Sequence, residues 1–549
     1  MTEYQVDETC IYDFNDFIFC AAIALFKLNS YNQQIMYRNT DILRNFAAKL
    51  LAVALLLFLP AFSGAQPSGE IVKISVAGPV KYRSGSYRFR DKARELAQKF
   101  PGKRAKTVAI NQPGISFYAD RNALQIGEQT SFFVDKNGAD NRKKLAAVLK
   151  VIGKHCYVYL EKGCKAKEGD LKRVADFFDR RIYPQTTSAF GSEWKPGIDG
   201  DPRITLLLLA GMKGCDGFFY PGDEYPADAQ PDSNEREMLY LSIDRMKDVD
   251  DFMGHLTAHE LQHMIHWNND SNETYWVEEG LSEYAATFFG CMPWTAEQFF
   301  QYPDRNLFDW EDTKEAENYG RAFLFVDYLL TQAKSAGVDR LSLLREIVKC
   351  QAAGVTGISE ALSGVAETLK FNNVFRDFCA ATFLHESFNG AHPYRFSAFV
   401  SEKLKKYALR RVMPRKVFKT ASASIRGTVS MWSAVGYSFS LQNRPAKLRL
   451  KFDGSILKHD KGNNVFLPGL AFTDSAGKHA PKVVWFKTNA GKLERSIRIA
   501  DDNYDTLLLI VCNQGPMKYL DGDGRLPRVG FQFSLDEIDT RFETLHQKP

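Results

Sequence analysis

The sequence predicts an α+β fold in three parts: an N-terminal β-rich region, a central domain of strands and helices, and a C-terminal β-sandwich. The length of 549 residues exceeds what one hydrophobic core accommodates, so several domains are expected. In the central part, strand-like runs are followed by long runs with helical spacing, which is typical of α+β domains. From about residue 420, short apolar runs alternate with turn dipeptides, which is typical of a β-sandwich.

The composition and the net charge limit the class of protein and the kinds of partner that are expected. Hydrophobic residues make up 45% and charged residues 25% of the chain, which are the proportions of an ordinary globular protein. The net charge of +5 is small for this length and gives no reason to expect nucleic acid as a partner.

An unbroken apolar run, LLAVALLLFL, occupies residues 50–59. Basic residues precede it, and a proline and small residues up to Ala65 follow, which is the pattern of a secretory signal peptide. The run is shorter than the roughly 20 apolar residues of a membrane span, so no stable span is expected after cleavage. Residues 1–65 are interpreted as a leader, with the signal peptide at about 36–65 and a mis-assigned start at 1–35. We expect a secreted, periplasmic or cell-surface protein.

Seven cysteines follow the leader, and none belongs to a CxxC pair, so a cysteine zinc site is not expected. Cys156 and Cys164 flank a strand-like run. Two interpretations stay open for them: a disulfide across a hairpin, which export permits, or two free buried thiols. The odd number leaves at least one thiol free or intermolecular.

Two regions flank the central domain. Residues 66–165 are interpreted as an N-terminal β-rich domain or a propeptide, and the sequence does not separate these alternatives. Residues 420–545 form the expected sandwich, which is a candidate binding module for a surface or carbohydrate ligand. Strands are expected in the N-terminal region at residues 82–89, 129–135 and 155–160.

The central domain is assigned to residues 166–415. Its strand at 204–209, ITLLLL, is apolar throughout and is therefore expected to be buried on both faces. A second strand is expected at 238–243. Besides the helix that carries the motif described next, helices are expected at 171–182, 278–289, 319–333, 341–350 and 371–383.

One motif carries the chemistry. In the run HELQH, His259 and His263 are four residues apart on a helix, so both imidazoles face the same way and can bind one metal ion. This ligand type and spacing suit zinc. Glu260 lies beside the first ligand, where it can take a proton from metal-bound water and pass it to a leaving amine. A chance H-E-x-x-H is expected in about one chain in a hundred of this length, so the surrounding residues have to show whether the motif is a metal site.

A catalytic zinc needs a third protein ligand and an open position. One arrangement requires glycine and histidine at positions that here hold His266 and Asn269, so it fails. The other takes a glutamate from a following helix. The run WVEEGLSEY supplies Glu279, with Glu283 four residues later on the same face.

Glu283 is expected to accept the second imidazole N–H of His259, as carboxylates beside metal-bound histidines do. Glu278 is the competing third ligand. Glu279 is favoured because it directly precedes Gly280 and pairs with Glu283.

Together these residues resemble the Glu-zincin (gluzincin) clan of metallopeptidases. Within that clan, the chain most resembles the hyicolysin-like secreted neutral metallopeptidases, through the runs FFDRRIYPQTTSAFG, DGFFYPGDEY, NEREMLYLS, HELQHMI and WVEEGLSEYA. The resemblance covers about residues 125–335. It implies a zincin-like catalytic domain with His259, His263 and Glu279 as zinc ligands and Glu260 as general base.

Other residues are candidates with competing structural interpretations. His255 shares the helix face of His259, whereas His266 is interpreted as a helix-end residue. Tyr319 opens a helix at a place where some relatives carry an oxyanion donor, which gives it either that role or an ordinary packing role. Tyr284 is interpreted as a core residue.

The fold that the resemblance implies also predicts how substrate binds. The strand at 238–243 would be an exposed edge to which an extended peptide adds. In the loop before it, Asp216, Asp223 and Glu224 are candidates for calcium ligands, and a solvated loop is the favoured alternative.

We therefore expect an exported zinc metalloendopeptidase that hydrolyses peptide bonds of extracellular proteins. One alternative is an exopeptidase or a peptidase confined to a single partner. Another is a non-catalytic surface protein or adhesin built on a zincin core. The joint presence of four chemistry-bearing residues (His259, Glu260, His263 and Glu279) argues against a non-catalytic protein.

Overall fold

The computed structural model describes residues 84–100, 124–137, 141–246, 248–301, 306–308, 310, 316–406, 414–441, 445–455, 465–499, 503–515 and 526–538. The chain divides into two compact units, Met1–Val76 and Ala77–Pro549, and every described residue belongs to the second. The leader expected at residues 1–65 therefore lies outside the described residues. Among the residues described, no helix is long and apolar enough to cross a membrane.

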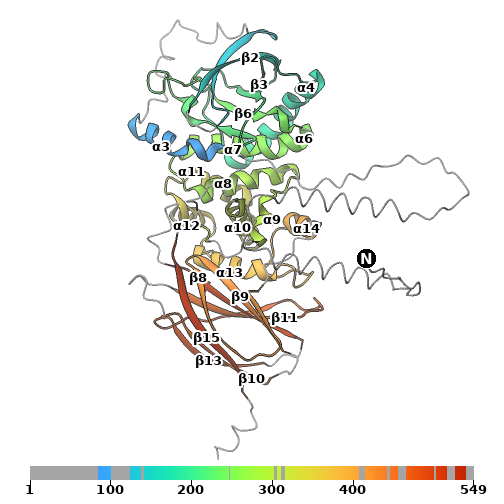
Figure 1. Ribbon diagram of the computed structural model, residues 1–549, viewed down its shortest axis with the longest axis vertical. Coiled ribbons are helices and arrows are strands. Elements are labelled where there is room, and N and C mark those ends of the chain that lie inside the picture. The colour runs from blue at the N-terminus through green and yellow to red at the C-terminus, as the bar shows by residue number, and fades with distance from the viewer. Residues whose placement is uncertain are drawn as a thin grey trace, which may run out of the picture. The chain divides into compact units, whose positions relative to one another are not determined.

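A six-stranded mixed sheet forms the first part of the described chain (Figure 1). Its strand order is β1-β2-β3-β4-β6-β5, with parallel pairing of β3 to β4 and of β4 to β6 and antiparallel pairing elsewhere. The strands are β1 (Gln129–Val134), β2 (Lys143–Ile152), β3 (Cys156–Glu161), β4 (Ile204–Leu209), β5 (Gly217–Phe219) and β6 (Met238–Ser242). Every residue of β4 is buried, as its continuous apolar run predicts.

The N-terminal region differs from expectation in two respects. The strand expected at residues 82–89 is wrong over its described part, because a 3-10 turn, η1 (Ser86–Phe89), leads into helix α3 (Arg90–Lys99). Arg90, Ala93 and Leu96 are the buried residues of α3, and their spacing of three gives the helix one inward face. In addition, the boundary expected at residue 165 falls between β3 and β4, which pair within one sheet.

The exposed edge strand is also not the expected one. Strand β6 lies between β4 and β5, so the interpretation of residues 238–243 as a sheet edge is wrong. Residues 217–219, which fall in the loop expected before residues 238–243, form β5 instead. Phe218 of β5 stacks on Tyr240 of β6, with ring centroids 4.3 Å apart, and this packing stabilises the extra strand.

Helices follow the sheet and carry the predicted motif. Helix α7 (Ala258–Asn269) is buried around its whole circumference from its first residue to Trp267, and it packs against β5 and α8 (Tyr275–Ala285). A Cβ at Gly280 would lie 3.0 Å from the Ala322 carbonyl oxygen, so glycine lets α8 approach α10 closely. The remaining α-helices are α4 (Glu168–Phe177), α5 (Tyr183–Phe190), α6 (Val249–Phe252), α9 (Thr295–Gln301), α10 (Ala316–Ser335), α11 (Arg340–Lys349), α12 (Gly354–Val365), α13 (Phe371–Leu384) and α14 (Ala398–Lys406).

Short irregular helices connect these elements. They comprise the π-helical turns η4 (Phe178–Ile182) and η7 (Met253–Thr257) and the 3-10 turns η5 (Pro221–Glu224), η6 (Ile243–Arg245) and η8 (Ala286–Phe289). The turn η7 runs directly into α7, which matters for the site described below.

The C-terminal part consists of two sheets, drawn in orange and red in Figure 1. Aromatic rings pack between them; Tyr437 and Phe533, for example, have centroids 5.1 Å apart. One sheet has the order β13-β10-β15-β8 and the other β12-β11-β14-β9-β7. The strands are β7 (Lys416–Phe418), β8 (Ala423–Ser430), β9 (Ser433–Ser440), β10 (Lys447–Asp453), β11 (Phe466–Thr473), β12 (Lys482–Trp485), β13 (Lys492–Arg498), β14 (Thr506–Asn513) and β15 (Arg528–Ile538).

Among the described residues, the seven cysteines are all free thiols. Of the two interpretations for Cys156 and Cys164, the structure therefore has free thiols, with Cys156 buried in β3 and Cys164 partly exposed.

Candidate metal centre

The two histidines of the motif lie on one face of α7. Because α7 is a regular α-helix, residues four apart stack one turn above the other. The Nε2 atoms of His259 and His263 are 3.0 Å apart, and their side chains have exposed fractions of only 4% and 1%. Both imidazoles therefore present a nitrogen to the same small volume away from solvent.

Helix α8 adds a carboxylate to this volume. Glu279 Oε2 lies 3.3 Å from His259 Nε2 and 3.4 Å from His263 Nε2. The three donor atoms all lie within 4.8 Å of one another, and all three residues are buried. Two imidazole nitrogens and one carboxylate oxygen are a donor set that zinc accepts with a position left open. The triad could therefore hold a metal ion.

Electrostatics couple the three groups. Burial opposes ionisation of Glu279, but its attraction and hydrogen bonds to the two imidazoles outweigh burial and lower its pKa to about 2. Burial likewise opposes protonation of His259, yet its hydrogen bond to Glu279 raises its pKa. Burial also opposes protonation of His263, but attraction to Glu279 and hydrogen bonds to Glu278 and Glu279 raise its pKa well above the ordinary value. Since metal ions bind neutral imidazole, protons compete for the site, and metal affinity should rise with pH.

Glu278, the competing third ligand, points elsewhere. Its Oε2 forms an ion pair with Arg90 Nε at 2.9 Å, and its Oε1 lies 3.3 Å from His263 Nδ1. Ser282 Oγ also lies 3.2 Å from that nitrogen. Glu278 and Ser282 thus hold the imidazole of His263 from the side opposite Glu279, which is the position that Glu283 was expected to take for His259.

Glu283 does not approach His259. Its Oε2 lies 3.6 Å from Nε2 of His255, and its Oε1 accepts a hydrogen bond from Thr295 Oγ1 at 3.5 Å. The expected contact with His259 is therefore corrected. His255 belongs to the π-helical turn η7, whose wider spacing breaks the four-residue rule, and this explains why it pairs with Glu283 instead of continuing the ligand face.

Glu260 is buried and hydrogen-bonded to a residue that the sequence analysis missed. Ser86 Oγ donates to Glu260 Oε2 at 2.6 Å, whereas Oε1 has no hydrogen-bond partner among the described residues. Ser86 Oγ also accepts from the backbone N–H of Phe219 in β5 at 2.8 Å. The preceding Gly85 N–H donates to the Gly217 carbonyl at 2.7 Å. The N-terminal segment therefore lies along β5 and reaches Glu260.

The structure tests the interpretation of Tyr284 but leaves the proposed role of Tyr319 open. Tyr284 is 5% exposed and belongs to the core, as expected. Tyr319 lies in the first turn of α10, 8% exposed, and its ring packs edge-on against Trp310 with centroids 5.0 Å apart. Its assignment as an oxyanion donor stays a prediction.

The loop before β6 does not assemble the predicted calcium ligands. Both carboxylate oxygens of Asp223 accept hydrogen bonds from Arg142, at 2.9 and 3.1 Å. Among the described residues, two groups of three or more metal-binding side chains come together, and neither contains Asp216, Asp223 or Glu224. A calcium ion at these residues is therefore not supported.

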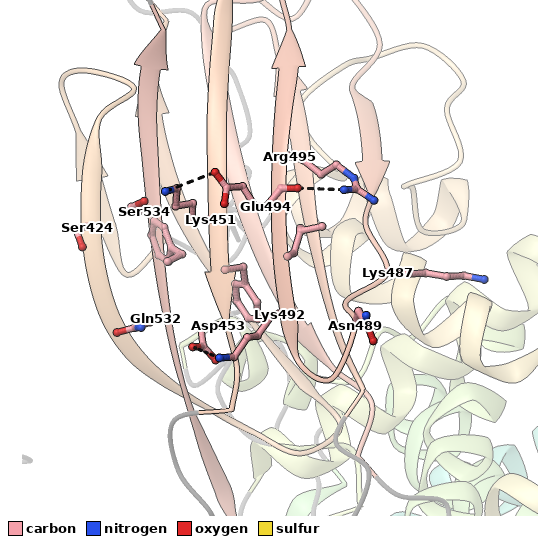
Figure 2. A pocket seen from close by; sticks show the side chains of 13 residues that line it. Ser424, Lys451, Asp453, Lys487, Asn489, Lys492, Glu494, Arg495, Gln532 and Ser534 are labelled. Atoms are coloured by element: carbon pink, nitrogen blue, oxygen red, sulfur yellow. Dashed lines mark hydrogen bonds and ion pairs between the residues drawn. The ribbon is translucent and has the colours of Figure 1, made fainter.

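A groove of about 840 Å³ lies on the four-stranded C-terminal sheet (Figure 2). Its charges largely pair with each other: Lys451 Nζ lies 3.5 Å from Glu494, and Lys492 Nζ lies 3.6 Å from Asp453. This internal pairing identifies no ligand, so a surface or carbohydrate ligand for the C-terminal region stays a prediction.

The ligand assignment predicts a clear contrast between adjacent glutamates. Glu279→Ala removes one of three donors, and we expect the zinc ion of the triad to be lost at concentrations that saturate this site in the unaltered chain. Glu278→Ala removes only a partner of His263 and should weaken zinc binding by about 10- to 100-fold. Titration of each purified variant with zinc against a competing chelator measures the difference. Stronger loss in Glu278→Ala would contradict the assignment.

Comparisons with known proteins add little to this geometry. No protein-family model matches the sequence, and no curated protein matches it. Among solved structures, one match is a family GH115 4-O-methyl-α-glucuronidase with specificity for decorated arabinogalactans. The two are 11% identical, the match covers 70% of this chain and 64% of that one, and the TM-score is 0.13, too low for any shared fold to be argued.

Proposed function

We propose that this chain is an exported zinc metalloendopeptidase of the Glu-zincin clan, related to the hyicolysin-like peptidases. The observation that carries the proposal is the convergence of His259, His263 and Glu279 beside Glu260, a buried carboxylate on the same helix. A fold of sheet, motif helix and ligand-bearing helix agrees with a zincin-like catalytic domain. The secreted, periplasmic or cell-surface location rests on the apolar run before Ala65.

The residues divide the chemistry between them. Zinc at the triad would supply Lewis acidity, polarising a peptide carbonyl and making water nucleophilic near neutral pH. His259, His263 and Glu279 would hold the ion, while Glu278 and Ser282 orient the imidazole of His263. The carboxylate of Glu260 accepts a proton from the attacking water and delivers it to the departing amine.

Substrate recognition is assigned to β5 in place of β6. Strand β5 is the outer strand of the sheet and packs against α7. Its neighbour on the free side is the short segment around Gly85. A peptide that paired with this edge through its main chain would lie beside Glu260, which suits an endopeptidase that acts on extended protein segments.

The state of Glu260 disfavours a non-catalytic adhesin. A buried carboxylate with one oxygen unpaired among the described residues is costly, and a purely structural helix gains nothing from it. Such a group is expected where it serves chemistry.

Metal analysis combined with a protease assay tests the proposal. We expect the purified chain to contain zinc and to cleave members of a peptide library, to lose activity with a zinc chelator and to regain it with added zinc. The assay is run before and after limited proteolysis of the N-terminal segment. A zinc-loaded chain that cleaves no peptide under either condition would contradict the proposed peptidase activity and support metal binding alone.

A further inference from the structure

We propose that His266, Asp270 and Glu273 form a second divalent-metal site, distinct from the triad described above. The three side chains lie where α7 ends and α8 is about to begin, and their donor atoms are all within 4.8 Å of one another. Their residues are 1%, 6% and 2% exposed. The site does not rest on peptidase activity.

Unpaired polar atoms point to a missing ligand. Within the described residues, neither ring nitrogen of His266 has a hydrogen-bond partner, and Asp270 Oδ2 has none. Buried polar atoms in folded proteins are nearly always paired, so three unpaired atoms in one group call for an explanation. A cation would engage an imidazole nitrogen and the free Asp270 oxygen together.

The opposite carboxylate oxygens are already fixed by the backbone. Asp270 Oδ1 accepts the N–H of Asn272 at 2.9 Å. Glu273 Oε1 accepts the N–H of Thr274 at 2.5 Å and the N–H of Gly354 at 2.7 Å. These bonds orient both carboxylates before any ligand arrives, as the surroundings of metal sites commonly do.

Helix electrostatics give a separate argument. Asp270 is the C-cap residue that directly follows α7, and the C-terminus of a helix carries partial negative charge. A carboxylate is unfavourable there, whereas a cation is favourable. A bound ion would therefore neutralise an arrangement that otherwise places like charges together in a buried place.

The donor set selects the kind of ion. An imidazole nitrogen with two carboxylates suits Zn²⁺ and related transition ions, whereas calcium and magnesium prefer oxygen donors alone. The two carboxylates balance a divalent charge. The positive charge of Arg90, which acts on His266, is offset by the negative charge of Glu278, with which Arg90 forms an ion pair at 2.9 Å. The ion would join the end of the helix carrying His259 and His263 to the start of the one carrying Glu279.

Zinc counting on the full chain tests the site. After zinc-free preparation and reloading, we expect about two zinc ions per unaltered chain and about one in Asp270→Asn. The matched control is Asp250→Asn, which changes an exposed aspartate paired with Arg173 and should keep both ions. Glu279→Ala should lose the ion at the triad and keep the second one.

Crystals of the unaltered zinc-loaded chain provide a measurement that needs no variant. Anomalous scattering at the zinc edge should show a peak bound by His266 and Asp270 as well as a peak at the triad. A peak at the triad alone, or equal zinc content in Asp270→Asn and the unaltered chain, would overturn the second site. Two peaks in a chain without peptidase activity would overturn the proposed function and leave this site standing.

Discussion

Glu260→Gln is expected to abolish peptide hydrolysis while leaving zinc bound. Glutamine has the same shape as glutamate and can still accept the hydrogen bond that Ser86 donates, so the packing of α7 is preserved. It cannot accept a proton from water, and loss of general-base catalysis typically reduces turnover by about 10²- to 10⁴-fold. The histidine and Glu279 donors are untouched, so zinc affinity should stay close to that of the unaltered chain.

The measurement compares kcat and zinc content for three proteins. The unaltered chain sets the reference, and Glu346→Gln on the surface helix α11 is the matched control, expected to retain full turnover. A Glu260→Gln variant that cleaves peptides at the reference rate would remove Glu260 from the mechanism. A variant that loses zinc as well would show that Glu260 supports the site structurally.

Arg142→Ala should lower the free energy of unfolding more than any other substitution proposed for this protein. Arg142 and Asp223 form an ion pair at 2.9 Å with side chains only 2% and 1% exposed. Arg142 also donates to the Phe133 and Asp232 carbonyls at 2.7 and 2.8 Å. Its removal leaves the buried Asp223 carboxylate without its counter-charge and the Asp232 carbonyl without this donor, whereas the Phe133 carbonyl keeps a hydrogen bond from Asn234 at 3.0 Å. Breaking a buried pair in this way costs about 3–5 kcal/mol.

Urea unfolding of the variant checks the size of the effect, and its pH dependence checks the cause. Burial already raises the pKa of Asp223 above its ordinary value of 3.8, against the opposing effect of Arg142. Without Arg142 that pKa rises further, so the folded variant binds a proton that the unfolded chain releases. Its stability should therefore fall as the pH increases above 3.8.

Arg173→Ala is the control for this experiment, because Arg173 forms an ion pair with Asp250 at 2.7 Å on the surface. Little change in unfolding is expected there, since solvent screens exposed pairs. If both variants unfolded at the same urea concentration, the buried network around Asp223 would not be a stabilising feature.

The parts that the sequence predicted well depend on local spacing. His259 and His263 face the same way because an α-helix repeats every 3.6 residues. The strand at 204–209 was predicted to be buried because its run of residues is apolar throughout, and every residue of β4 is buried. Glu279 was found because it lies on the next helix, only 16 positions from His263 in sequence.

The parts that were missed depend on contacts between distant segments or on irregular helix geometry. Ser86 and Glu260 are separated by 174 positions, and no spacing rule connects them. Arg142 meets Asp223 across 81 positions. Glu283 was paired with the wrong histidine because the π-helical turn η7 is not visible in the residue pattern.

The segment around Gly85 would compete with any peptide that bound at the edge of β5. Its N–H already holds the Gly217 carbonyl, and the next residue, Ser86, already holds Glu260. An extended peptide that paired at the same point could not do so until this tethered occupant left. Because the occupant belongs to the same chain, its effective concentration does not fall on dilution. The apparent affinity for a peptide that bound at β5, as proposed, would therefore scale with the fraction of molecules in which the segment is detached.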